Sequence, residues 1–284
     1  MGGTDVTRTR LPDWAVDMAD LHVHATPSLL PRHGDDAATV AAERRQGFRT
    51  VVLKAHEGST VERAAIAGEH VHGGIVLNSP VGGANPDAVE VAARLGGRVV
   101  WMPTVSSRTH KAGAASPELS VHRGFELRPV DVVENGRLRP EWYDVLDAVA
   151  AHDLLLASGH LSAEETVVLF TEARRRGVRR LLVNHPKMAF LHWNDAAAAE
   201  LRRLDAHLEL GILPDLLGRP EHSSLTLTGS CPPSLLVFGG DLGHAHHATP
   251  ADAVAPWLHH LEERVGARNA AAIMTTTTRS LLLP

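Results

Sequence analysis

The chain has 284 residues, 44% of them hydrophobic and 21% charged, which is ordinary for a globular protein with one large α/β domain. A net charge of −5 argues against a nucleic-acid partner, and no apolar run approaches the length of a membrane span. A single cysteine, Cys231, excludes an intramolecular disulfide. Because the amino terminus has no signal-like apolar core, we expect a cytoplasmic protein.

Short apolar runs recur along the chain, with helix-like segments between them. The runs cover residues 14–25, 49–56, 73–80, 97–104, 152–160, 179–186, 206–215 and 234–241. Eight strands that alternate with helices predict a parallel sheet closed into a (β/α)₈ TIM-type barrel, as a single domain over residues 1–284. An open doubly wound sheet is the alternative, but no Gly-x-Gly-x-x-Gly follows the first run to support a dinucleotide site.

The helix-like segments carry typical start and stop residues. They cover residues 35–48, 59–71, 85–97, 141–152 and 162–178. Predicted amino-terminal caps are Thr60, Asn85 before Pro86, Ser162 and Asn194. Glycines at 47, 96 and 177 are expected to end helices.

Two segments break this rhythm. Residues 105–140 form an excursion after the fourth strand, and Asn135-Gly136 within it predicts a two-residue hairpin turn. In a barrel this inserted segment would lie at the carboxyl face, where substrate loops are found. Residues 216–233, between the last two strands, are poor helix material.

Polar residues gather where the predicted strands end. Along the chain these are His22, His24, Lys54, His56, Asn78, Thr104, His160, Asn184, His185 and Asp241. Side chains two residues apart on a strand point the same way, so His22 and His24 share a face. In a barrel all these strand ends meet at one mouth.

The strand-end set predicts a metal site. Imidazole nitrogen and carboxylate oxygen suit Zn²⁺ best here, with Mn²⁺ or Fe²⁺ as alternatives. The two histidines of the first strand, together with His160, His185 and Asp241, are enough ligands for one or two ions. A bound ion would activate water, and Asp241 would take up its proton.

The ordered set resembles the amidohydrolase superfamily of metal-dependent (β/α)₈ hydrolases: His-x-His on strand one, His on strands five and six, and Asp on strand eight. The stretches "DLHVHATPSLLPR", "VVLKAHEGST" and "GGDLGH" are similar to the DUF6282 family in particular. The resemblance implies that His22, His24 and Asp241 hold one metal. It further implies that His160 and His185 hold a second metal or the reacting water.

One departure from the superfamily stands out. Many members with two ions bridge them with a carboxylated Lys or a Glu on strand four, whose end here reads "VVWMPTVSS". Lys54 on strand two is the nearest substitute, either as a carboxylated bridge or as an ammonium that holds a substrate anion. His56 shares its face and is a further candidate ligand or catalytic residue.

Polar residues near this mouth favour a small anionic or amide-bearing substrate, with Arg32, Asn78 and Lys54 as its contacts. We therefore expect hydrolysis of a C–N or lactone-type bond, without nucleic-acid or membrane partners. Two other classes stay open. They are a histidinol-phosphatase-like phosphoesterase, and a non-oxidative decarboxylase or binding protein on the same barrel. A homo-oligomer is possible as well.

Overall fold

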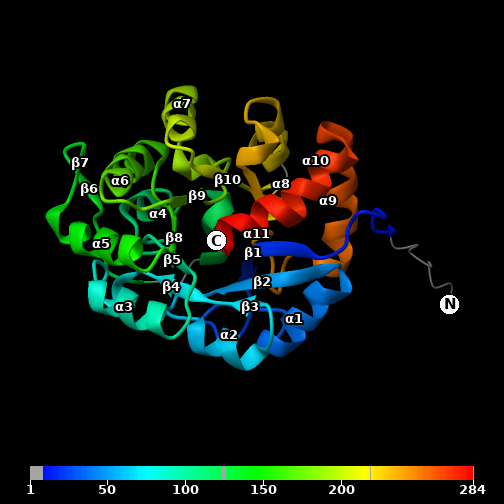
Figure 1. Ribbon diagram of the computed structural model, residues 1–284, viewed down its shortest axis with the longest axis horizontal. Helices are drawn as coiled ribbons and strands as arrows, with labels where there is room; N and C mark the ends of the chain where they lie inside the picture. Colours follow the sequence, from blue (N-terminus) through cyan, green and yellow to red (C-terminus); the bar gives the residue numbers. More distant parts are fainter. Residues whose placement is uncertain (1–8, 123–125, 218, 284) are drawn as a thin grey trace.

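A ring of parallel strands surrounded by helices forms the molecule (Figure 1), and the computed structural model describes residues 9–122, 126–217 and 219–283. Each of the eight predicted apolar runs contains a strand. The ring strands are β1 (Met18–His24), β2 (Phe48–Lys54), β3 (Val71–His72), β4 (Gly74–Val76), β5 (Val99–Trp101), β8 (Leu155–Ala157), β9 (Arg180–Val183), β10 (His207–Leu210) and β11 (Leu236–Phe238).

The strands close into the predicted (β/α)₈ barrel. β3 and β4 are two halves of one strand, separated by Gly73, because β3 pairs with β2 and β4 pairs with β5. From β4 the order runs through β5, β8, β9, β10 and β11. The chain beyond β11 then returns to β1: the amide of Asp241 donates to the His22 carbonyl over 2.8 Å, and that of His24 to the Leu242 carbonyl over 3.0 Å.

Helices surround the strands, most of them around the outside of the barrel (Figure 1). They are α1 (Asp36–Arg45), α2 (Val61–Ala67), α3 (Pro86–Arg94), α4 (Arg108–Ala112), α5 (Tyr143–Ala151), α6 (Ala163–Arg175), α7 (Asp195–Arg203), α8 (Leu213–Leu216), α9 (Pro250–Val265), α10 (Ala267–Ala272) and α11 (Thr278–Leu282). Within the described ranges, none of them is both long and apolar enough to cross a membrane.

Most of the predicted helix caps are confirmed. The side chains of Asn85, Ser162 and Asn194 accept backbone hydrogen bonds at the starts of α3, α6 and α7. Thr60 precedes α2 as predicted, but its hydroxyl does not cap that helix. Instead it donates to the Leu53 carbonyl over 2.6 Å, because it is fully buried beside β2.

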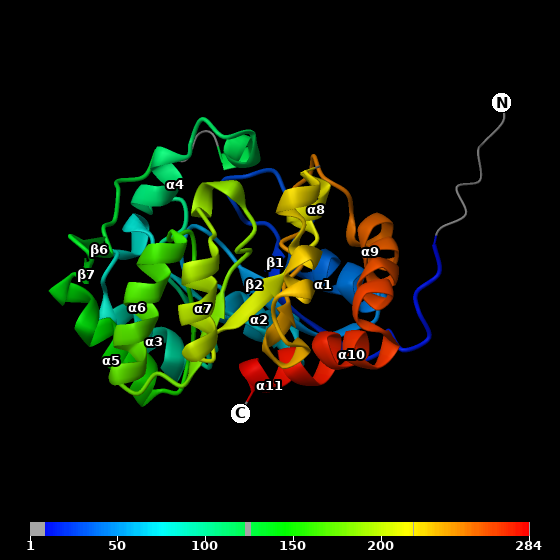
Figure 2. The same cartoon turned by 90° about the horizontal axis from the view of Figure 1, so that it is seen from above.

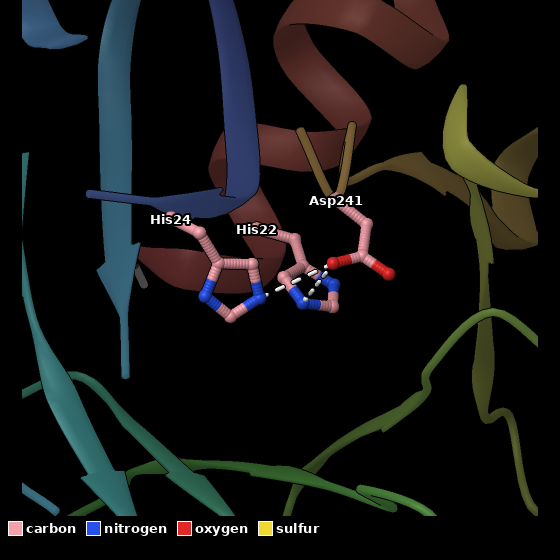
Figure 3. A group of neighbouring side chains, drawn as sticks. All are labelled: His22, His24 and Asp241. Carbon is pink, nitrogen blue, oxygen red and sulfur yellow. Dashed lines mark ion pairs between the residues drawn. The ribbon is translucent and has the colours of Figure 1, made fainter. Parts of the chain in front are cut away.

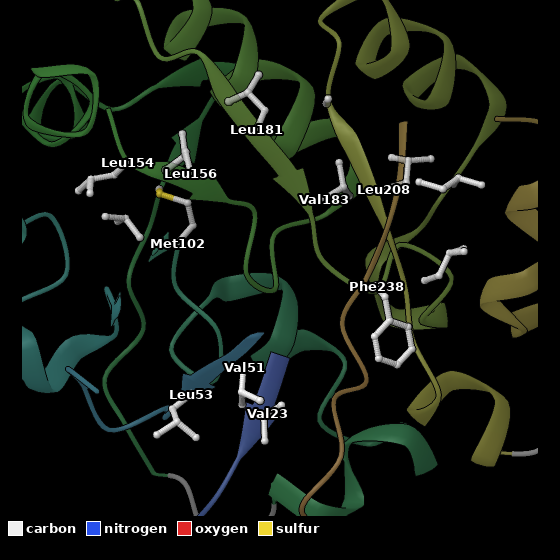
Figure 4. Packing of buried hydrophobic residues seen from close by; sticks show 14 of the residues in the cluster. Val23, Val51, Leu53, Met102, Leu154, Leu156, Leu181, Val183, Leu208 and Phe238 are labelled. Atoms are coloured by element: carbon white, nitrogen blue, oxygen red, sulfur yellow. The ribbon is translucent and has the colours of Figure 1, made fainter. Parts of the chain in front are cut away.

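Two apolar clusters lie on opposite faces of the strands. Val51, Leu156 and Leu181 belong to the larger cluster (Figure 4), which also contains helix residues from around the ring. Their neighbours Val52, Leu155 and Leu182 belong to a smaller cluster with Leu281 and Leu282 of α11. Since side chains alternate along a strand, the smaller cluster fills the barrel interior, and α11 covers its amino end.

The excursion begins at the opposite end of the barrel from α11, where Figure 2 shows α4. Its predicted hairpin is confirmed as β6 (Val133–Glu134) and β7 (Arg137–Leu138). Asn135 and Gly136 have φ angles of 51° and 71°, as a tight hairpin turn with two left-handed residues requires. Residues 216–233 contain only short helical turns in their described part, also as expected.

Two buried acids lie between the barrel and α1. Asp20 on β1 accepts hydrogen bonds from the amides of His22 (2.8 Å) and Gly240 (3.0 Å). Glu43 on α1 is 1% exposed, and neither oxygen of its carboxyl has a hydrogen-bond partner in the described chain. Burial raises the pKa of Asp20 to about 7 and that of Glu43 well above 4.5, and the charge of Asp20 adds to the shift of Glu43.

We expect Glu43→Met to stabilise the protein at pH 7 by about 1–3 kcal/mol, because it removes a buried polar group that lacks a partner. The unfolded chain releases the Glu43 proton near pH 4.5, whereas the folded chain retains it. The wild-type free energy of unfolding therefore falls as pH rises above about 4.5, and the advantage of the variant grows over the same interval. Urea unfolding between pH 4 and 8 measures this difference, and exposed Glu69→Met is the control.

Candidate metal centre and active-site pocket

A β-bulge directs the first-strand histidines. Asp20 pairs with Val51 and Val23 with Leu53, so Leu21 and His22 together lie opposite the single residue Val52. Leu21 and His22 therefore both turn into the barrel. The Asp20 carboxylate holds this bulge by accepting the His22 amide. Simple alternation predicts the shared face of His22 and His24, but not the bulge.

His22, His24 and Asp241 come together at the carboxyl end of the barrel (Figure 3). Oδ1 of Asp241 lies 3.1 Å from Nε2 of His22 and 3.2 Å from Nε2 of His24. These are the residues of the predicted first metal site. Within the described part of the chain they are the only group of at least three His, Cys, Asp or Glu residues with ligand atoms this close together.

The other nitrogen of each imidazole is held by an acceptor. Nδ1 of His22 lies 3.0 Å from Oε1 of Glu209, and Nδ1 of His24 lies 3.0 Å from the Lys54 carbonyl. A carbonyl and a carboxylate only accept hydrogen bonds, so both Nδ1 atoms carry the proton. Both Nε2 atoms thus point toward Asp241, in the orientation that metal-binding histidines take when outer residues hold their second nitrogen.

Charge within the group fits a cation. Burial lowers the pKa of His22, but Asp241 and Glu209 outweigh it and raise the pKa to about 9. Burial raises the pKa of Asp241, yet His22 and His24 outweigh it and lower that pKa well below 3.8. A carboxylate facing two imidazole nitrogens thus attracts a positive charge between them. The donor set and its burial therefore fit a divalent ion, whose binding would displace the His22 proton.

His160 and His185 lie beside this group but outside it. The His185 ring is 5.7 Å from that of His22 and 5.0 Å from that of His160. Nδ1 of His185 is buried and has no hydrogen-bond partner among the described residues, so it is available to a ligand or water. Nδ1 of His160 lies 2.8 Å from Nδ1 of His110. A second ion at His160 and His185 stays a prediction.

Lys54 and His56 both point inward from the end of β2. Nζ of Lys54 is 3.0 Å from Nε2 of His22 and faces the Trp101 ring, 5.7 Å from its centroid. Burial lowers the pKa of Lys54 to about 8, although Asp241 and Glu209 oppose the shift. Nδ1 of His56 is 2.9 Å from the Thr104 hydroxyl, and its ring is 5.1 Å from that of His24. Their catalytic roles stay predictions.

The three predicted substrate contacts lie in different surroundings. Arg32 lines a pocket next to the metal group, with Nη2 3.3 Å from Nδ1 of His24. Lys54 is 1% exposed behind His22. Asn78 is fully buried, and its amide bonds the His56 carbonyl, the Thr104 hydroxyl and two backbone amides. Asn78 thus positions Thr104 and His56, and no polar atom of its amide remains for a substrate.

Sequence reasoning missed Glu209 and His122 of the excursion, and it did not place His110 beside the predicted ligands. Glu209 on β10 is fully buried and accepts from Nδ1 of His22, the His185 amide and the Asn184 side chain. Its signal in the sequence is a lone carboxylate within the apolar run "HLELGIL". The rings of His110 and His122 lie against those of His56 and His160, and the centroids of the contacting rings are 4.9–5.9 Å apart. No strand-end pattern could find them.

Residues 17–209 match the profile of a family of unknown function, DUF6282, which covers more than half of the chain. The chain belongs to DUF6282. The match runs from β1 into β10 and therefore includes both first-strand histidines and Glu209, whereas Asp241 follows it. No curated protein matches this DUF6282 chain.

Solved structures with the same fold include enzymes of the amidohydrolase superfamily. A probable 2-pyrone-4,6-dicarboxylic acid hydrolase from Acinetobacter baumannii is 11% identical at a TM-score of 0.64, over 94% of this DUF6282 chain and 99% of the other. An amidohydrolase from Pseudomonas aeruginosa is 11% identical at a TM-score of 0.60, and the match covers 95% of this chain and 96% of the other. A 2,6-dihydroxybenzoate decarboxylase is 12% identical at a TM-score of 0.58, and the match covers 94% of this chain and 99% of the other. At such identities the likeness establishes the fold alone.

Proposed function

We propose that this protein is a metal-dependent hydrolase of the amidohydrolase type, in which His22, His24 and Asp241 hold one divalent ion, Zn²⁺ by ligand preference. The observation that carries the proposal is the convergence of two Nε2 atoms on Oδ1 of Asp241, with both Nδ1 atoms held by acceptors. Two neutral imidazoles and one carboxylate leave coordination positions for water and substrate. The proposed reaction is the hydrolysis of a C–N or lactone-type C–O bond.

Such an ion would lower the pKa of a water toward ~7 and polarise the carbonyl of the substrate. Asp241 takes the proton of the attacking water as general base and returns it to the leaving group. Its second oxygen, which points away from both imidazoles in Figure 3, is suited to this task. His185, whose buried Nδ1 has no hydrogen-bond partner in the described part of the chain, donates to or accepts from the reacting group.

Metal analysis of protein purified without chelators tests the proposal. We expect Zn²⁺, Mn²⁺ or Fe²⁺ near one ion per chain, because three oriented ligands bind tightly at neutral pH. Less than about 0.2 ions per chain after reloading with Zn²⁺ would contradict the proposed centre. A screen of lactones, cyclic amides and phosphate esters with the loaded protein then identifies the bond, and turnover of phosphate esters alone would favour a phosphoesterase.

A further inference from the structure

The pocket beside the metal group has two chemically different walls. It contains about 450 Å³ of space, including its open mouth. One wall is polar and carries Arg32, Asp241, Glu118 and a set of histidines: His24, His56, His122, His160, His185, His244 and His247. The other wall is apolar and consists of Leu119, Met188, Phe190 and Leu213. A molecule that fills this pocket must have one polar and one apolar end.

Arg32 is the cation of the polar wall. No carboxylate of the described residues lies within ion-pair distance of its guanidinium; its Nε donates over 3.4 Å to the Ser28 hydroxyl. Glu57 is nearby, and its Oε1 accepts from the Ser28 hydroxyl and from the Leu29 amide. The backbone of Arg32 forms an antiparallel β-bridge with that of His244, which connects the loop after β1 to the segment after β11. Arg32 is thus held at the pocket with donors left for an anion.

Among the described residues that line the pocket, Arg32 is the only lysine or arginine. Asp241 and Glu118 supply negative charge in the same lining, and Glu118 accepts a hydrogen bond from the Ala189 amide over 2.9 Å. One planar guanidinium matches the two oxygens of a carboxylate, whereas a phosphate dianion would need more positive charge than this wall offers.

The apolar wall is one packed cluster of side chains. Leu119, Met188 and Phe190 are 2–4% exposed and form one cluster, against which Leu213 packs. The ring of Phe190 lies 5.4 Å from that of His160, so the apolar wall borders the histidines directly. Contact with four apolar side chains favours the binding of a substrate with a flat hydrocarbon group over that of a fully polar substrate.

We propose that the substrate is a ring-bearing monocarboxylate, whose carboxylate pairs with Arg32 and whose ring lies on Leu119, Met188, Phe190 and Leu213. This inference rests on the proposed hydrolase in that the reacting bond then lies toward His24 and Asp241. Arg32 is in this view the residue that determines specificity for an anion. It contacts substrate without taking part in bond cleavage.

Calorimetric titration with four probes tests the inference: benzoate, its neutral counterpart benzamide, the ringless acetate, and inorganic phosphate. We expect benzoate to bind about tenfold or more tightly than benzamide, since a charge-assisted pair is lost in the amide. Benzoate should exceed acetate by a similar factor because acetate leaves the apolar wall uncovered. Phosphate should bind more weakly than benzoate.

Variants separate the two walls. Arg32→Gln should remove the preference for benzoate over benzamide, while the exposed Arg268→Gln control should keep it. Leu213→Asn should reduce the preference for benzoate over acetate and leave acetate binding unchanged. Equal binding of benzoate and benzamide to the wild type, or an unchanged preference in Arg32→Gln, would overturn the inference. Circular dichroism of each variant verifies folding.

Titrations before and after chelator treatment separate this inference from the metal proposal. Benzoate binding that depends on Arg32 in both forms supports the inference, whatever the metal content. Benzoate binding that needs added Zn²⁺ and ignores Arg32→Gln would place the carboxylate on the metal. That result would refute the role of Arg32 and leave the hydrolase proposal intact.

Discussion

Replacing Asp241 with asparagine is expected to lower kcat by about 10³-fold while the protein stays folded and retains most of its metal. The amide oxygen of asparagine can still bind an ion, but the side chain cannot take a proton from water. Steady-state kinetics of the Zn²⁺-loaded variant, on the compound identified by the substrate screen, measure the loss. Metal content of the same sample shows that the loss is catalytic.

The matched control is Asp87→Asn, which makes the same chemical change at an exposed position on α3. Near-wild-type turnover of Asp241→Asn would remove Asp241 as the general base.

A labelled-water experiment with the wild type distinguishes hydrolysis from decarboxylation. Incorporation of ¹⁸O into the product is expected for a hydrolase, whereas release of CO₂ without incorporation would favour a decarboxylase on the same barrel.

The second large effect concerns metal binding. His24→Ala should weaken Zn²⁺ binding by more than about 100-fold, because the loss of a ligand exceeds the 10–100-fold effects typical of outer residues. Competition with a fluorescent chelator at pH 7.5 measures the affinity. His260→Ala, an exposed histidine on α9, should leave it unchanged. Equal affinities of His24→Ala and wild type would exclude the proposed centre.

Lys54→Met should change the same affinity in the opposite direction. Its Nζ lies 3.0 Å from the His22 nitrogen that would bind the ion, so a free ammonium there repels a cation. We expect the variant to bind Zn²⁺ up to about tenfold more tightly. Weaker binding that is restored by short carboxylates such as formate would instead identify Lys54 as a carboxylated bridge.

Local patterns in the sequence determined the fold to a large extent. Each apolar run contains a strand, because a short β-branched or leucine-rich run between glycines buries its side chains on both faces of a parallel sheet. The turn at Asn135-Gly136 and the helix cap at Ser162 depend on neighbours in the chain, and both are confirmed. Thr60 stands at the cap position of α2 as predicted, but its hydroxyl makes a tertiary contact with the Leu53 carbonyl and does not bond the helix backbone.

Residue order alone also placed His22, His24 and Asp241 at one end of a barrel, since parallel strands present their carboxyl ends together. Only the tertiary structure decided how these side chains are oriented. Three features depend on pairing between distant strands. They are the bulge at Leu21 and His22, the hydrogen bond between Glu209 and Nδ1 of His22, and the position of Lys54. Such contacts leave no periodic trace in the sequence.

In the pocket, too, the sequence predicts some features and only the tertiary structure decides the others. Arg32 was predicted from its place after the first strand, and the structure has it at the pocket wall. The apolar wall joins Leu119 of the excursion to residues that follow β9 and β10, which are far apart along the chain. The sequence by itself determined which chemical groups reach the barrel mouth. Tertiary packing decided which of them face each other, because packing depends on strand register and loop paths.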